Sequence, residues 1–203
     1  MPREPDPPSP HELAILLDHL RVADPTLYTF VIVGAMTGAR RAQLLGLRWR
    51  DIDFARGKIA FCNGWVEGPN GPELTHTKPK RRHSVELDQT SVDALRNRAD
   101  FYGAIDRDEF VFSERDGAAW KPNRVTKSFQ RHITAAGLRP FRLHDLRHFM
   151  ATKMLNAGVP IPIVSRRLDH RRVSTTLDFY SHSTPARDRF GADTLRGVLS
   201  GTT

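Results

Sequence analysis

The sequence predicts an α+β fold that is mainly α-helical and contains a small three-stranded antiparallel sheet. Two observations lead to this class. Apolar residues recur at spacings of three and four over most of the chain, as in helices that bury one face. Residues 58–87 instead hold short extended runs separated by turn residues, among them Asn70-Gly71, a strong hairpin signal. The 203 residues are enough for one core, so a single domain is the default expectation.

The chain opens with a proline-rich segment that leads into two helices. Residues 1–8 include four prolines and are expected to form a linker. Ser9 and Glu12 fit a capping box at the start of the first helix. The second helix is expected to begin at Pro25 and to end at Gly38. A linker that leads directly into a domain suggests an N-terminal domain that is absent from this chain.

The later elements are read from periodicity and from breaking residues. Gly137 and Gly158 are each expected to end a helix, because glycine tolerates the left-handed conformation that closes helices. In chain order, the expected elements are a short helix at 40–45, strands at 58–62, 73–78 and 83–87, a helix at 88–101, an extended piece at 109–112, and helices at 122–136, 144–156, 162–168, 174–180 and 188–199.

The charge balance points to an anionic partner. Lysine and arginine number 31 against 23 aspartate and glutamate residues, which gives a net charge of +8 and a pI of about 10.2. Nucleic acid is the commonest such partner, and a merely solvated basic surface is the alternative. Cys62 is the single cysteine, so no internal disulfide can form. No apolar run reaches the roughly 20 residues of a membrane span, so no membrane partner is expected.

The stretch from residue 141 to residue 182 holds the strongest candidate chemistry. His144 and Arg147 share one helix face at a spacing of three. An arginine fork binds two phosphate oxygens at once, and a neutral histidine exchanges protons near pH 7. A surface arginine beside a capping histidine is the alternative. A zinc helix is a further alternative, since His144 and His148 are four residues apart. Zinc is disfavoured, because Arg147 would place a cation beside the metal.

Further cations and one tyrosine complete the candidate set. Arg40 lies at a helix start, where its side chain and free backbone N–H groups can face an anion. Pro79 biases Lys78 toward extended geometry, so Lys78 is expected to project from a strand or hairpin tip. Tyr180 is hypothesised to attack a phosphodiester; clustered cations favour its phenolate, and a core aromatic is the alternative. The basic run that contacts nucleic acid, or forms a solvated turn, is Lys80, Arg81 and Arg82.

Taken together, these motifs resemble the tyrosine recombinases, the phage-integrase family. The resemblance extends from residue 9 to residue 182, and five motifs in the right order make it specific. Residues 37–40 and 44–53 resemble the first arginine box, Thr77-Lys78 with Val85 and Leu87 the hairpin lysine, residues 144–148 with 157–159 the second box, Leu168-Asp169-His170 the third box, and residues 175–182 the segment of the nucleophile.

The resemblance implies a catalytic domain that cuts and rejoins double-stranded DNA. Tyr180 would form a 3′-phosphotyrosyl bond and free a 5′-hydroxyl. Arg40 and Arg147 would clamp the non-bridging oxygens, and Lys78 would protonate the leaving oxygen. The two histidines would act beside them: His144 would take the tyrosine proton and His170 would bind a phosphate oxygen. It also implies no metal or other cofactor, a tetrameric homo-oligomeric synapse on DNA, and a cytoplasmic, bacterial or phage-encoded protein.

Three features depart from the family pattern. Gln43 stands where glutamate is usual, and we expect it to hydrogen-bond nearby backbone or an arginine. Asp169 stands where glycine is usual and brings negative charge near the phosphate site, so Asp169→Gly is expected to be neutral or to improve cleavage. The short N-terminus leaves no room for a core-binding domain, so weak and salt-sensitive DNA affinity is expected.

The expected domain division and the alternative functions follow from the same resemblance. We expect a linker at 1–8, the catalytic domain at 9–182, and a tail at 183–203 whose helix docks on a neighbouring protomer. Gln43 and Asp169 would also fit an inactive DNA-binding remnant, but the intact catalytic set argues against it. A type IB topoisomerase would use the same chemistry without synapsis, and the order of the motifs favours a recombinase.

Overall fold

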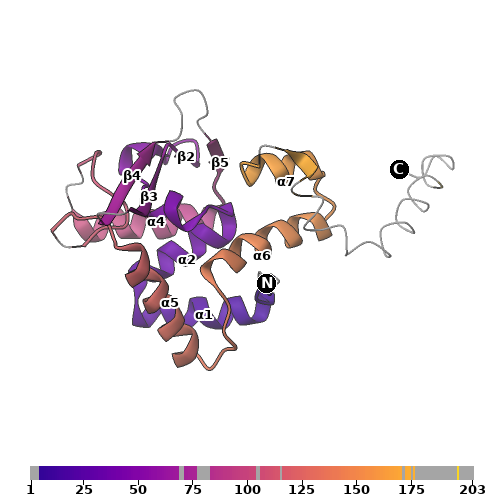
Figure 1. Ribbon diagram of the computed structural model, residues 1–203, viewed down its shortest axis with the longest axis horizontal. Helices are drawn as coiled ribbons and strands as arrows, with labels where there is room; N and C mark the ends of the chain where they lie inside the picture. The colour runs from indigo at the N-terminus through magenta and orange to yellow at the C-terminus, as the bar shows by residue number, and fades with distance from the viewer. Residues whose placement is uncertain are drawn as a thin grey trace.

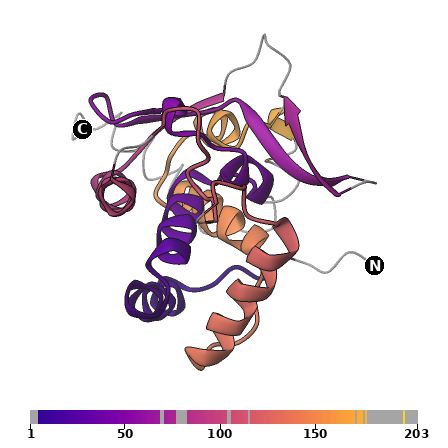
Figure 2. The same ribbon diagram turned by 90° about the vertical axis from the view of Figure 1, so that its left-hand side faces the viewer.

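The computed structural model describes residues 5–68, 71–76, 83–103, 106–114, 116–170, 172–174, 176 and 196. The elements are α1 (Pro10–Ala23), α2 (Pro25–Thr37), α3 (Arg41–Leu45), the 3-10 turn η1 (Trp49–Asp51), β1 (Ile52–Asp53), β2 (Lys58–Phe61), β3 (Asn63–Gly68), β4 (Gly71–His76), β5 (His83–Glu86), α4 (Gln89–Tyr102), α5 (Pro122–Ala135), α6 (Leu143–Asn156) and α7 (Ile161–Arg167). The strands gather at one end of the molecule and α1 and α5 at the other, with α2 between them (Figures 1 and 2). The predicted α+β class, mainly helical, is confirmed.

The first two helices begin and end where local chemistry places them. The Ser9 hydroxyl accepts from the Glu12 N–H at 3.1 Å, and the Glu12 carboxylate accepts from the Ser9 N–H at 2.7 Å. This confirms the predicted capping box. Gly38 closes α2 with a φ of 70°, a conformation that glycine adopts without steric cost. The described part of the preceding segment is attached to the domain, because Arg139 donates to Asp6 at 2.6 Å and to the Pro7 carbonyl at 2.9 Å.

The sheet differs from the prediction in its membership. The expected strands at 58–62 and 83–87 pair as β2 and β5, but the third strand of that sheet is β1. The strand expected at 73–78 is β4, and it pairs with β3 in a separate two-stranded ribbon. Residues 109–112 contribute one isolated bridge, from Phe110 to Arg48, and no strand. The expected helices at 174–180 and 188–199 lie largely outside the described residues.

The core forms around α2 and extends along α6. Helix α2 is apolar on nearly every side and buries nine of its residues, which identifies it as a central helix. Helix α6 contributes Leu146 to the main cluster, while its later residues Met150 and Leu155 pack with Val164 of α7 in a second cluster. Helix α6 is thereby packed against the main core through Leu146 and against α7 through its later residues. Within the part of the chain that the structure describes, no helix is long and apolar enough to cross a membrane.

Candidate active site

Arg147 is the structural centre of the candidate site. It lies on α6 with only 5% of its surface exposed. Its Nη1 donates to the Gly38 carbonyl at 2.6 Å, and its Nη2 donates to the Leu168 carbonyl. Those two carbonyls belong to the C-terminal caps of α2 and α7. One planar guanidinium therefore fixes the ends of two helices against a third, as a rigid fork can do and a single ammonium cannot.

Arg40 reaches the same place from the start of α3. It lies two residues after Gly38 in extended geometry, and its side chain is 43% exposed. The Gln43 side-chain oxygen accepts from the Arg40 N–H at 2.9 Å, which confirms the expected hydrogen bond of Gln43 to nearby backbone. This cap fixes the start of α3. The Arg40 Nη1 lies 3.7 Å from the Asp169 carboxylate, on the loop that follows α7.

His144 and His170 complete a cluster with the two arginines. Burial lowers the pKa of His144, and the positive charges of Arg147 and Arg40 lower it further. Burial, with the same two arginines, lowers the pKa of His170 to about 4. Both imidazoles are therefore neutral near pH 7. The structure thus brings Arg40, His144, Arg147 and His170 within one another's electrostatic field, although 130 positions separate Arg40 from His170 in the chain.

Two further residues of α6, Asp145 and His148, lie beside the site and contact its neighbours on the same helix. Asp145 is 2% exposed, and its carboxylate accepts from the backbone N–H of Arg142 at 2.8 Å and from the Arg142 guanidinium at 2.8 and 3.1 Å. It is thus an anchor for the start of α6, which is a different role from the general base of a zinc helix. The His148 ring lies edge-on to that of His144, with centroids 5.0 Å apart.

The remaining predicted residues fall outside the described part of the chain. Lys78, Tyr180 and the basic run Lys80, Arg81 and Arg82 are all in this group, so their roles stay predictions. His83, the first residue of β5, is a residue that the sequence pattern did not mark. It is buried, and its Nε2 lies 3.0 Å from the Arg166 carbonyl oxygen. Burial lowers the pKa of His83; the charge of Asp169 opposes this lowering and the charge of Arg147 adds to it. The start of β5 therefore lies in the field of the cluster.

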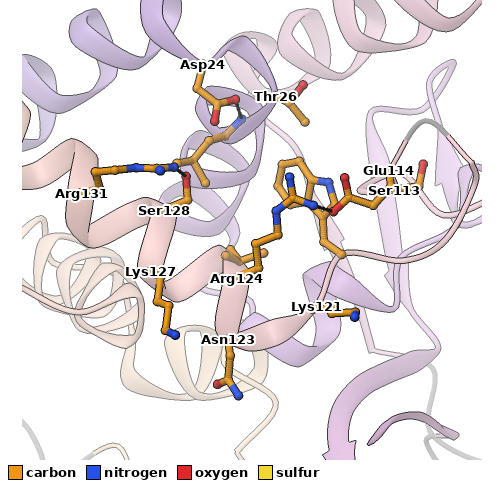
Figure 3. Close-up of a pocket in the computed structure, with 13 residues that line it drawn as sticks. Asp24, Thr26, Ser113, Glu114, Lys121, Asn123, Arg124, Lys127, Ser128 and Arg131 are labelled. Atoms are coloured by element: carbon orange, nitrogen blue, oxygen red, sulfur yellow. Dashed lines mark hydrogen bonds and ion pairs between the residues drawn. The ribbon is translucent and has the colours of Figure 1, made fainter.

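A basic cleft runs along α5, outside the four-residue cluster. Its volume is about 810 Å³. Lys121, at the N-cap of α5, and Arg124, Lys127 and Arg131 of the helix line it at spacings of three and four (Figure 3). Arg124 pairs with Glu114, and Arg131 donates to Ser128 at 3.1 Å. Helix α5 is connected to the start of α3, because Arg41, next to Arg40, donates to Thr126 of α5 at 2.6 Å. The spacing of three and four residues between these basic side chains is visible in the sequence, but it was not among the predicted site features.

Stability is expected to fall as the pH drops from about 6.5 to about 4. Burial, together with neighbouring positive charge, lowers the pKa of His148 and of His170 to about 4 from 6.5. Between these values the unfolded chain binds more protons than the folded one, so folding stability rises with pH in that window. Urea midpoints measured across the window should show the slope. His170→Gln should make the slope shallower, and an unchanged slope in that variant would contradict the pKa assigned to His170.

Similarity to known proteins identifies the family of this chain. The model of the phage integrase family matches residues 9–187, and the chain belongs to that family. Its relatives include the ICEBs1 integrase of Bacillus subtilis, 27% identical over 184 residues, which cover 84% of this chain and 49% of that protein. The integrase of Salmonella phage P22 is 29% identical over 164 residues, 76% of this chain and 38% of that protein. The chain thus spans about half or less of the length of these relatives.

Solved structures share the fold. The Tn1549 transposon integrase, in complex with transposon right-end DNA, superposes with a TM-score of 0.84 at 19% identity, over 96% of this chain and 67% of that one. The catalytic domain of bacteriophage HP1 integrase gives a TM-score of 0.66 at 20% identity, over 98% of this chain and 99% of that one. The predicted resemblance to tyrosine recombinases and to their catalytic-domain fold is therefore confirmed.

Proposed function

We propose that this chain is the catalytic domain of a site-specific DNA recombinase that cleaves and rejoins DNA through a 3′-phosphotyrosyl intermediate. The observation that carries the proposal is the convergence of Arg40 and Arg147 with the neutral imidazoles of His144 and His170. Two guanidinium groups and two imidazoles in a partly buried site can bind a phosphodiester and stabilise the charge that develops as it reacts. Membership of the phage integrase family supports the same reaction.

In the proposed reaction one phosphate ester bond forms as another breaks, and each proton transfer has a named donor or acceptor. The Tyr180 oxygen attacks the scissile phosphorus and the bond to the 5′-oxygen breaks, so a phosphodiester is exchanged for a phosphotyrosine diester. His144 accepts the phenolic proton, which its lowered pKa permits because the ring is unprotonated at neutral pH. Lys78 donates a proton to the leaving 5′-oxygen. Arg40, Arg147 and His170 hold the non-bridging oxygens, and attack by a 5′-hydroxyl reverses each step.

The basic cleft along α5 supplies a surface for the DNA backbone. Lys121, at the N-cap of α5, and Arg124, Lys127 and Arg131 of the helix are exposed and line the cleft, whereas Val125 and Phe129 of the same helix are buried. Phosphate contacts of this kind are independent of base sequence and weaken steeply with salt. The structure of the Tn1549 relative contains DNA, which supports double-stranded DNA as the partner of this chain also.

Lys127→Ala is expected to weaken DNA binding by a similar factor on every sequence, and to reduce the salt slope of the affinity by about one. Its ammonium lies on the exposed side of α5 and lines the cleft. Fluorescence anisotropy over a range of salt concentrations measures the slope. Arg56→Ala removes the same charge from an exposed turn, where Arg56 pairs with Asp53 at 3.1 Å, and should leave the slope unchanged. Equal slopes in the two variants would argue against DNA contact by α5.

The wider organisation belongs to the same proposal. The division into a linker at 1–8, a catalytic domain at 9–182 and a tail at 183–203 stays a prediction, as does docking of the tail on a neighbouring protomer. A tetrameric synapse on DNA and a cytoplasmic location, which the family resemblance implies, are part of the proposal as well. Deleting residues 190–203 should weaken assembly more than DNA binding, and unchanged assembly would count against the docking tail.

Covalent trapping tests the proposed reaction. Nicked duplexes with randomised sequence around the nick lose the short cleaved fragment, so the DNA–protein adduct accumulates. We expect the adduct to form with the wild-type chain, to map to Tyr180, and to be absent in Tyr180→Phe. Tyr28→Phe is the matched control, because Tyr28 lies on α2 beside Arg21, and it should still form the adduct. DNA binding without any adduct would indicate the inactive remnant. An adduct without strand exchange between two sites would indicate the topoisomerase.

A further inference from the structure

The loop after α7 contains an unusual backbone position. Among the described residues other than glycine, only Asp169 has a positive φ, at 51°. The Asp169 N–H bonds to the Arg166 carbonyl at 3.0 Å, and the His170 N–H bonds to the Ser165 carbonyl at 3.1 Å. This is the Schellman pattern, in which the left-handed residue is usually glycine. An aspartate here carries a backbone cost that glycine would avoid, so its side chain is the feature that needs a reason.

The Asp169 carboxylate faces the cluster of positive groups. Its Oδ2 lies 3.7 Å from the Arg40 Nη1, with 25% of the side chain exposed. The preceding carbonyl, that of Leu168, accepts from Arg147, which fixes the loop against α6. Burial lowers the pKa of His83 and of His170, and the Asp169 charge opposes that lowering in both. The carboxylate thus acts on groups from α3, β5 and its own loop.

A carboxylate and a phosphodiester seek the same partner. Both are anions that arginine binds through its N–H groups, and two like charges at one guanidinium repel each other. We propose that the Asp169 carboxylate competes with a phosphodiester for Arg40. The carboxylate must be displaced from Arg40 before a phosphodiester can bind there. This inference rests on the proposed function, because it concerns the regulation of the same site. In the free protein, Arg40 is therefore paired with Asp169. The protein binds preferentially to DNA that makes enough other contacts to displace the carboxylate.

Asp169→Asn removes the negative charge of the side chain and changes little else. Asparagine keeps the size of the side chain and tolerates the left-handed conformation, so the loop is retained. Asp18→Asn is the matched control, because Asp18 is an exposed aspartate on α1 that pairs with Arg21 at 3.4 Å. Inorganic phosphate is the first probe, and its binding is measured by the rise of the unfolding midpoint with phosphate concentration. Asp169→Asn should bind phosphate about fivefold more tightly than wild type, as expected for loss of one partly exposed ion pair.

The second measurement is the rate of adduct formation on nicked DNA, which should rise in Asp169→Asn and stay at the wild-type value in Asp18→Asn. Unchanged or weaker phosphate binding in Asp169→Asn would overturn the inference, even if all three proteins form the adduct. Tighter phosphate binding with no adduct in any of them would leave the competition standing and would refute the proposed function instead. Loss of the adduct in Asp169→Asn alone would also overturn the inference, since it would show that the carboxylate is needed for the reaction.

Discussion

Arg147→Ala is expected to abolish DNA cleavage and to destabilise the fold in the same variant. The change removes a group that would stabilise the reacting phosphate, and loss of one such donor costs roughly a hundredfold or more in rate. It also leaves the carbonyls of Gly38 and Leu168 without the donors that now reach them from Arg147. Each buried carbonyl left unsatisfied costs about 1–3 kcal/mol. Single-turnover cleavage of nicked DNA and urea denaturation measure the two effects.

Two variants separate these effects of Arg147. Arg147→Lys keeps the charge but cannot reach both carbonyls in the fork geometry, so it should recover only part of the stability and little of the cleavage. Lys153→Ala removes one charge from an exposed position on the same helix and should leave both quantities near wild type. Full cleavage by Arg147→Lys would contradict the proposed role of the guanidinium in binding two phosphate oxygens at once. Full stability of Arg147→Ala would contradict the structural one.

Gly38→Ala is expected to cost about 2–4 kcal/mol of folding stability. Gly38 has a φ of 70°, and an added Cβ would lie 2.1 Å from the Met150 methyl and 3.2 Å from a Leu168 methyl. The Met150 side chain is flexible but buried in the second core cluster, so it can yield only by disturbing that packing. The carbonyl of Gly38 would move with it, and Arg147 would lose one acceptor. Chemical denaturation and the cleavage assay should therefore both show a loss.

Gly158→Ala provides the comparison for Gly38. Gly158 has a similar φ of 80°, but an added Cβ there would meet nothing within 4 Å. It should lose only the cost of the left-handed backbone, about 1–2 kcal/mol, and should retain cleavage. Equal losses of stability in the two variants would show that the contacts around Gly38 carry no energetic weight.

Local signals predicted the helices well and the sheet less well. The caps at Ser9 and Gly38 depend on neighbouring residues, so sequence patterns identify them. Strand β3 was missed because it contains Asn63, Gly64 and Gly68, which have low strand propensity. Its pairing with β4 provides the stabilisation that its composition lacks. Which strands share a sheet depends on such tertiary contacts, and no local pattern in this sequence encodes them.

The residue types of the candidate site were predictable, but the physical basis of their arrangement was not. Motif order singled out Arg40 and Arg147, yet the partners of Arg147 are backbone carbonyls that lie 109 and 21 positions away. Backbone acceptors leave no side-chain signal in a sequence. Asp169 was noticed as a departure from the family pattern, whereas its pairing with Arg40 required coordinates.

In the proposed reaction, Arg40 and Arg147 hold one phosphodiester between them. A crystal structure of Tyr180→Phe bound to a nicked duplex tests it most directly, because the variant binds the substrate without consuming it. We predict that the scissile phosphate lies within about 3 Å of nitrogen atoms of both arginines, and that the Asp169 carboxylate has moved away from Arg40. A duplex that lies along α5 while its scissile phosphate remains remote from both guanidinium groups would contradict the account.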